Sequence, residues 1–359
     1  MVAQKGEHDV KSTNKLFIER KDQSSLNRFF TDPKWDINPI LKEGKTLLQN
    51  EQKQDTSVEY EIFDDTVCRK YSQQTEMACY NYSSTMGTVL SHDYVTSLYV
   101  NNDLAVPDGL RLYGSEKKCQ EKGVEFKTKV QLACDIIIEE HVSRAKQTIC
   151  LWDSWFTCQE MALRCKKRDF NWIGEIKSNR IVYYEKEKLR LNELFDVLCS
   201  QGAFVDVVVD GEVYLAAKAN VYLPNVGSVA IVVNVKADTK DMHILCSDLC
   251  EFSLYEIVVH ALQRCKIETF HKEVKALGFG EYRFQASEVA LIHAHLVVLA
   301  YTLLDTLRRR LLRYNIVKSL FSIEATVEWV RKKAGHLFMH EVRSSKLPNR
   351  SLLRIIDTK

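Results

Sequence analysis

The sequence predicts a mixed α/β fold in which a β-rich insertion interrupts the alternation of strands and helices. The chain has 359 residues, enough for one large domain with insertions or for two domains with separate cores. Segments rich in β-branched and aromatic residues alternate with segments of helical period up to about residue 202. Strand-like segments then follow one another over 203–237, before an amphipathic helix over 254–278. We therefore expect a mixed sheet flanked by helices, with added strands before that helix.

The elements ahead of the insertion follow from their local patterns. Residues 1–55 are polar and predict helical pieces, with a serine cap and a proline turn in SSLNRFFTDPKWD. The segment SVEYEIFDD predicts a strand that ends on Asp64 and Asp65, and a β meander follows it. The next segments predict a helix in KTKVQLACDIIIEEHVSRA, a strand in QTICLWD, a helix in TCQEMALRCKKRD and a strand in FNWIGEIKSNRIVYY. Within the insertion, Asp210-Gly211 predicts a hairpin turn and Pro224-Asn225 a second break.

The composition is that of a globular protein and does not by itself indicate a partner. The formal charge is +2 at pH 7, and 45% of the residues are hydrophobic. Eleven cysteines are spread without paired spacing in a chain too large to need disulfide staples, so we expect free thiols. Cys246 and Cys250 form a CxxxC pair, but no second ligand pair accompanies them, which disfavours a zinc site.

Two segments bear on localisation. The N-terminal MVAQKGEHDV is too polar for a signal peptide. The most apolar run, Val289–Leu304, contains His293 and His295, is too short to cross a bilayer and is better interpreted as a buried helix. We expect no membrane association and a place in the cytoplasm, beside the nucleoid.

The helix over 254–278 carries a stripe of charged and titratable side chains. Steps of three and four residues place side chains on one side of a helix. The stripe consists of Arg264, Glu268, His271, Lys272 and Lys275. A solvated face is the default interpretation, with an Arg264–Glu268 ion pair that contributes only about 0.2–0.5 kcal/mol. Partners elsewhere in the chain are needed to favour a functional interpretation.

Three carboxylates at predicted element ends supply such partners. Asp65 and Asp153 follow predicted strands, and Glu268 lies on the charged helix. Carboxylates brought together repel one another unless a cation lies between them, which is how a two-metal site for phosphodiester chemistry is built. The alternatives are a turn aspartate at Asp65, since Asx turns are common, and a helix N-cap at Asp153. The residues alone leave these alternatives open.

Three colinear motifs resemble the Asp-Asp-Glu (DDE) transposases of cut-and-paste insertion sequences. They are IFDDTV followed by a basic residue, LWDSWFTCQEMALRCKKRDFNWIGEIKSNRIV, and QRCKIETFHKEVKALGFGEYRFQASEVALIHAHLVVLAYTLL. The resemblance covers roughly residues 24–330. The family signature Tyr-x2-Arg-x3-Glu-x6-Lys is matched by Arg264, Glu268 and Lys275, whereas Ala261 stands at the tyrosine position. The resemblance implies an RNase-H-like core with a β-strand insertion before the glutamate-bearing helix.

The resemblance also implies roles for individual residues. Asp65, with Asp64 as the less favoured neighbour, Asp153 and Glu268 would be the catalytic metal ligands for two Mg²⁺ ions, with Mn²⁺ as a substitute. Arg264 would grip a phosphate beside the scissile bond. The further phosphate or DNA contacts it implies are Lys275, His271, Lys177 and Arg180. A surface position without a DNA contact is an equal alternative for His271. A solvated strand end is an equal alternative for Lys177 and Arg180. Three tryptophans in apolar patterns are expected in the core: Trp152, Trp155 and Trp172.

The activity that the resemblance implies is DNA transposition by phosphoryl transfer. Nicking at a transposon end frees a 3′-hydroxyl, which attacks the opposite strand and, after hairpin opening, the target DNA. The implied partners are double-stranded DNA at the transposon ends and the target, and a second copy of the chain in a homodimer. The alternatives are a DNA-binding remnant impaired by Ala261, and an RNase-H-fold nuclease without strand transfer.

We expect five parts along the chain. They are an N-terminal helical segment over 1–55, which is a shortened DNA-binding region in this interpretation, a first core part over 56–202, a β-rich insertion over 203–250, a second core part over 251–306 and a basic helical region over 307–359. From Tyr301 onward there are 13 Lys/Arg against 5 Asp/Glu. This basic end predicts a surface for a polyanion, with a solvated tail as the alternative.

Overall fold

The computed structural model describes residues 57–102, 104–139, 145–236, 242–318 and 322–344, with separate positions between Asp22 and Thr46. The helical pieces expected over 1–55 lie mostly outside the described residues. The chain divides into two compact units. We call residues 52–67 and 77–270 the sheet unit, and residues 1–51, 68–76 and 271–359 the helical unit. The expected five-part division stays a prediction.

The described strands form one mixed sheet, in the order β2-β3-β1-β5-β6-β12-β11-β10-β7-β8, with β4 beside β3 and β9 beside β10. β1 pairs in parallel with β5, and β5 in parallel with β6, so their carboxyl ends lie at the same edge. The strands are β1 Val58–Arg69, β2 Cys79–Ser83, β3 Gly87–Asn101, β4 Leu104–Tyr113, β5 Gln147–Trp152, β6 Asn171–Glu175, β7 Ile181–Tyr184, β8 Glu187–Arg190, β9 Val205–Val209, β10 Glu212–Leu223, β11 Gly227–Lys236 and β12 Met242–Ser247.

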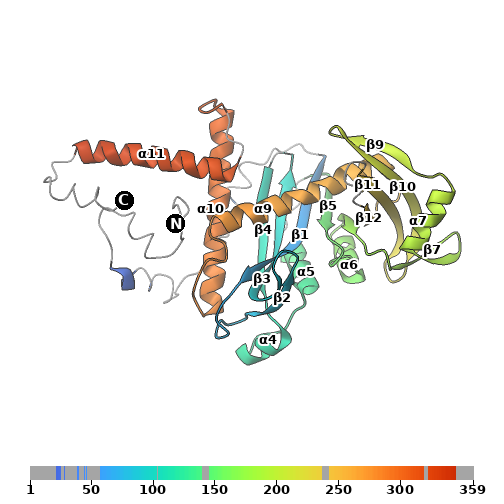
Figure 1. Ribbon diagram of the computed structural model, residues 1–359, viewed down its shortest axis with the longest axis horizontal. Coiled ribbons are helices and arrows are strands. Elements are labelled where there is room, and N and C mark those ends of the chain that lie inside the picture. The colour runs from blue at the N-terminus through green and yellow to red at the C-terminus, as the bar shows by residue number, and fades with distance from the viewer. Residues whose placement is uncertain are drawn as a thin grey trace. The chain divides into compact units, whose positions relative to one another are not determined.

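Helices flank this sheet, as the sequence predicts. α5 and α6 contact each other beside β3, β4 and β6 (Figure 1). Their apolar faces join a buried cluster with Phe63, Ile136, Trp152 and Met161. The helices are α4 Glu116–Lys122, α5 Lys129–Glu139, α6 Gln159–Lys167, α7 Leu191–Ser200, α8 Leu254–Ala261, the 3₁₀ turn η1 Leu262–Arg264, α9 Cys265–Ala276, α10 Ser287–Arg313 and α11 Ile323–Ser344.

The added strands lie between β6 and α8 along the chain. β10 and β11 form a long antiparallel hairpin, and β9 pairs with β10 through a two-residue turn. Asp210 and Gly211 make that turn with φ of 51° and 85°, as the Asp-Gly dipeptide predicts. β7 and β8, which precede residue 203, continue the same part of the sheet beside β10, and α7 contacts both strands.

Three predicted boundaries are wrong. The single strand expected over FNWIGEIKSNRIVYY is two strands, β6 and β7, which are not neighbours in the sheet. β1 continues to Arg69, so Asp64 and Asp65 lie inside the strand rather than at its end. The residues Thr66 and Val67 are β-branched, which favours this extension. The single helix expected over 254–278 is interrupted by η1, which separates α8 from α9 and contains Arg264.

In the helical unit, α11 packs across α10 (Figure 1). α10 is the one helix within the described residues that is long and apolar enough to cross a membrane, but 61% of its most apolar window is buried inside the protein. His293 and His295 are among its buried residues, as the interpretation of this run as a core helix predicts.

Candidate active site

Three acidic side chains lie side by side across β1, β5 and β6, inside β1 and at the carboxyl ends of β5 and β6. Phe63 pairs with Trp152, and Trp152 pairs with Gly174, in the two parallel ladders. The residues that come next on the three strands are Asp64, Asp153 and Glu175. Equal register directs these side chains to one face, because side chains alternate along a strand. We call these three residues the acidic row.

Two carboxyls of the acidic row, those of Asp64 and Asp153, have raised pKa values. Burial raises the pKa of Asp64 to about 7, and the carboxylates of Asp65 and Asp153 add to the effect. A hydrogen bond from the Asp65 amide to Asp64 Oδ1, at 2.8 Å, and the Arg264 charge act in the opposite direction. Burial also raises the pKa of Asp153, although its Oδ1 accepts a hydrogen bond from the Trp155 amide at 2.9 Å. A cation between these oxygens would relieve the repulsion.

Asp65 points to the other face of β1, where it already has a cation. Lys129, the first residue of α5, places Nζ 2.8 Å from Asp65 Oδ2 and also contacts the fully buried carboxylate of Asp93. Burial and the Asp65 charge raise the pKa of Asp93 to about 7, against the effect of Lys129. Burial alone would lower the pKa of Lys129, but the two carboxylates outweigh it and raise that pKa, so Lys129 stays charged.

Arg264 joins Glu268 to the acidic row. Its Nη2 lies 3.1 Å from Glu268 Oε1, the expected i, i+4 pair, and 3.2 Å from Glu175 Oε1. His243 Nδ1 lies 3.4 Å from the same Glu175 oxygen, and this contact and Arg264 lower the pKa of Glu175. The η1 turn therefore holds a guanidinium between the acids of the sheet and the acid of α9.

A cavity of about 580 Å³ is lined by Lys129 and by residues that follow the acidic row along the chain, Ser154 after Asp153 and Ile176 after Glu175. Three cations, Lys129, Lys177 and Arg180, line it together with one acid, Glu160, so its net charge suits an anion. Trp155 also lines it, with Lys177 Nζ 5.6 Å from the centre of the indole ring. Trp155 is 60% exposed, so its expected core position is wrong. It follows Asp153 in a turn, and α6 begins only at Gln159 with Cys158 as its N-cap, so the alternative of a helix N-cap at Asp153 is wrong.

Trp152 and Trp172 are buried and stacked, with ring centres 5.6 Å apart, as predicted for core residues.

The prediction that one charged stripe follows the helix is only partly correct. His271 is buried, with 8% of its surface exposed, although Lys272 and Lys275 of the same stripe are exposed. Lys275 is exposed farther along α9, in the helical unit, and its phosphate contact stays a prediction.

The donor set of the sheet unit fits a hard divalent ion. Across the described ranges, no three acidic, histidine or cysteine side chains converge as ligands on one point. Lys129 and Arg264 contact carboxylates there instead. The acids are nevertheless all oxygen donors, and those of Asp64 and Asp153 raise each other's cost of ionisation. Asp64, Asp153 and Glu268 therefore have the chemistry to hold Mg²⁺, with Asp65 as the alternative first ligand.

Comparison with known protein families gives two overlapping matches. Residues 13–193 match a family described as DDE superfamily endonuclease, and residues 109–311 match one described as archaeal putative transposase ISC1217. The chain belongs to the DDE transposases. No curated protein sequence matches it. The matched segments contain all the acids of the cluster, and the sheet with its flanking helices is the RNase-H-like fold of this superfamily.

Membership gives the chain a transposase-type nuclease function, DNA as its substrate and the general dependence of DDE endonucleases on divalent metals. The structure also shows partners that the motifs do not contain. Lys129 and Asp93 come from a helix start and a meander strand, and no local pattern links them to Asp65. Glu175 had no such signal either, because the sequence predicted one strand over FNWIGEIKSNRIVYY, and the end of β6 at Glu175 is seen only in the structure.

Proposed function

We propose that this chain catalyses Mg²⁺-dependent cleavage of transposon ends and joining of the freed 3′-hydroxyl to target DNA. The observation that carries the proposal is the acidic row with Glu268 joined to it through Arg264. Asp64 or Asp65, with Asp153 and Glu268, would hold two metal ions, and register favours Asp64 as the first ligand. Mn²⁺ would substitute for Mg²⁺.

The chain's own residues would bind and orient the DNA. Lys177 and Arg180 line the cavity formed by residues that follow the acidic row and would contact phosphate oxygens. Arg264 would hold Glu268 toward the acidic row before DNA arrives, and Lys275 would contact the backbone farther along α9. When bound, the metal ions would supply Lewis acids for the attacking and leaving oxygens. We propose a homodimer on two DNA ends and action in the cytoplasm beside the nucleoid.

The decisive test is a labelled duplex carrying the element's own ends, with Mg²⁺ present or absent. Glu268→Gln should reduce cleavage and joining by at least about 100-fold, because it removes a charged metal ligand worth several kcal/mol. Glu251→Gln makes the same chemical change at an exposed position before α8 and should leave both activities unchanged.

The same assay separates the alternatives. Cleavage without joining would indicate a nuclease of the same fold. Salt-sensitive DNA binding without cleavage by the wild type would indicate an impaired remnant and would point to Ala261, at the end of α8, as the position to restore to tyrosine.

A further inference from the structure

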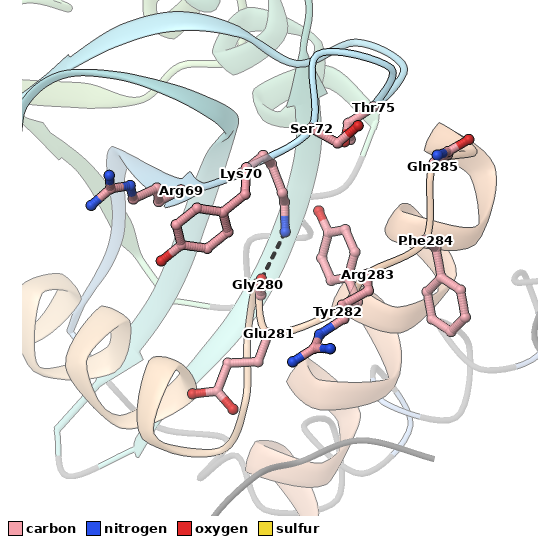
Figure 2. Close-up of a pocket in the computed structure, with 11 residues that line it drawn as sticks. Arg69, Lys70, Ser72, Thr75, Gly280, Glu281, Tyr282, Arg283, Phe284 and Gln285 are labelled. Carbon is pink, nitrogen blue, oxygen red and sulfur yellow. Dashed lines mark hydrogen bonds between the residues drawn. The ribbon is translucent and has the colours of Figure 1, made fainter. Parts of the chain in front are cut away.

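The helical unit contains a cavity that none of the predicted site residues lines. Its volume is about 520 Å³, and its walls come from the segment after β1 and from the loop between α9 and α10 (Figure 2). Both segments belong to the helical unit. The lining residues are Arg69, Lys70, Tyr71, Ser72, Thr75, Gly280, Glu281, Tyr282, Arg283, Phe284 and Gln285.

A buried lysine forms the inner part of this cavity. Lys70 is 7% exposed, and its Nζ donates a hydrogen bond to the Gly280 carbonyl at 2.7 Å. Figure 2 shows the side chain extended toward that carbonyl. The same Nζ lies 3.4 Å from the centre of the Tyr282 ring, close enough for a cation–π interaction. Burial lowers the pKa of Lys70 to about 8, so near neutral pH most of these side chains carry a charge.

Gly280 makes this arrangement possible. Its φ is +86°, a backbone angle that residues other than glycine rarely adopt. A Cβ at this position would lie 2.7 Å from Cys68 Sγ. The close approach of the loop to β1 brings the carbonyl to Lys70. The position of the Lys70 ammonium therefore depends on the backbone conformation at Gly280.

The mouth of the cavity combines cations with aromatic rings. Tyr71 is 87% exposed, and the Arg69 guanidinium lies 5.1 Å from its ring centre. Tyr282 and Phe284 stack with ring centres 6.4 Å apart and an interplanar angle of 14°. Arg283 is exposed beside them. Three basic residues against the single acid Glu281 leave the lining positive.

We propose that this cavity binds an unstacked nucleotide of single-stranded DNA. Its base would lie against the exposed ring of Tyr71, and the phosphates of the strand would contact Arg69 and Arg283. Base–aromatic stacking with a cationic track for the backbone is the general mode of binding single strands. A paired base in a duplex keeps both faces covered by its neighbours, so only an unpaired nucleotide offers a ring face and a phosphate together. The site goes beyond the cleavage chemistry but rests on the proposed function, in which strands separate at the cut.

The test measures binding without catalysis. The full chain carrying Glu268→Gln, with chelator in place of divalent metal, would be titrated into fluorescein-labelled oligothymidylate of about 12 nucleotides and followed by anisotropy. The comparison ligands are an abasic strand with the same number of phosphates and a duplex of equal length. We expect tighter binding of oligothymidylate than of the abasic strand.

Substitutions then locate that preference. Tyr71→Ala and Arg283→Ala should weaken oligothymidylate binding about 10-fold, and Tyr71→Ala should abolish the preference over the abasic strand. Tyr314→Ala, at a tyrosine that is 68% exposed in the same unit, is the control and should bind as the parent does. Tyr71 is so exposed that its loss should not affect folding, which circular dichroism checks.

Three results would overturn the proposal. One is equal affinity of the parent for oligothymidylate and the abasic strand, which means that charge alone binds. Another is unchanged oligothymidylate binding in Tyr71→Ala. The third is displacement by thymidine monophosphate as effective as by the oligonucleotide, which means a site for free nucleotide. None of these depends on cleavage, so the proposed function can fail or hold independently.

Discussion

Asp64 and Asp65 are adjacent residues with different surroundings. Asp64 stands in register with Asp153, whereas Asp65 is paired with Lys129 on the opposite face of β1. A lysine ammonium at 2.8 Å competes with a metal ion for the same oxygen. The difference makes the first metal ligand a question that single substitutions answer.

We expect Asp64→Asn to reduce Mg²⁺-dependent cleavage at least about 100-fold more than Asp65→Asn does, because only the former removes a ligand charge from the acidic row. Single-turnover cleavage with a labelled end duplex is the measurement, and the duplex affinity of each variant without metal is the control. The reverse order of the two effects would support Asp65 as the ligand.

For individual residues, the sequence predicted the pairing of Arg264 with Glu268, because helix periodicity alone sets that contact. It did not predict the Lys129 and Asp93 contacts, which depend on how β3, β1 and α5 meet in space. His271 was misplaced because it lies at the edge between the buried and exposed sides of α9.

Among the elements, α5 is attached at its first residue to two strands of the sheet. Lys129 reaches Asp65 on β1 and Asp93 on β3, and Asp93 is fully buried. An ion pair of this kind contributes little over an apolar replacement, but removing one partner leaves a buried charge. The start of α5 therefore depends on both partners together.

Lys129→Met should lower the free energy of unfolding by about 3 kcal/mol near neutral pH, since it leaves the Asp93 carboxyl without its cation. Adding Asp93→Asn should recover at least half of that loss. Urea unfolding followed by tryptophan fluorescence measures both. Lys127→Met removes a partly exposed pair with Asp135 and should change stability less; an equal loss in this control would contradict the prediction.

Element boundaries followed from sequence where a turn residue fixed them. The Asp210-Gly211 turn and the end of β5 at Trp152 are correct. The end of β1 was predicted too early, because acidic residues are unfavourable inside a strand unless cations compensate them. Lys129 and Arg264 supply that compensation, and the sequence did not show it. The break at η1 had no glycine or proline to mark it, so helical periodicity continued through it.

Over the whole molecule, the fold and family were predictable because three motifs follow one another in the family's order along the chain, and the two family matches together span them. The division into a sheet unit and a helical unit was not predictable, since residues 68–76 join segments far away in the sequence. The charge distribution is also a property of the whole chain. It is nearly balanced overall, with +2 at pH 7, yet strongly basic from Tyr301 onward.

This asymmetry predicts where general DNA affinity resides. Lys332 and Lys333 are exposed on α11, and Lys166 and Lys167 form a matching exposed pair on α6. If the basic end contacts the backbone, Lys332→Glu/Lys333→Glu should weaken binding to a duplex of arbitrary sequence about 10-fold. It should also reduce the slope of log affinity against log salt by about 2, since each lost phosphate contact removes about 0.9. Lys166→Glu/Lys167→Glu changes the net charge equally and should leave the slope within about 0.5 of the wild type. Equal effects of the two pairs, measured by anisotropy over a salt series without divalent metal, would mean that net charge rather than the basic end determines binding.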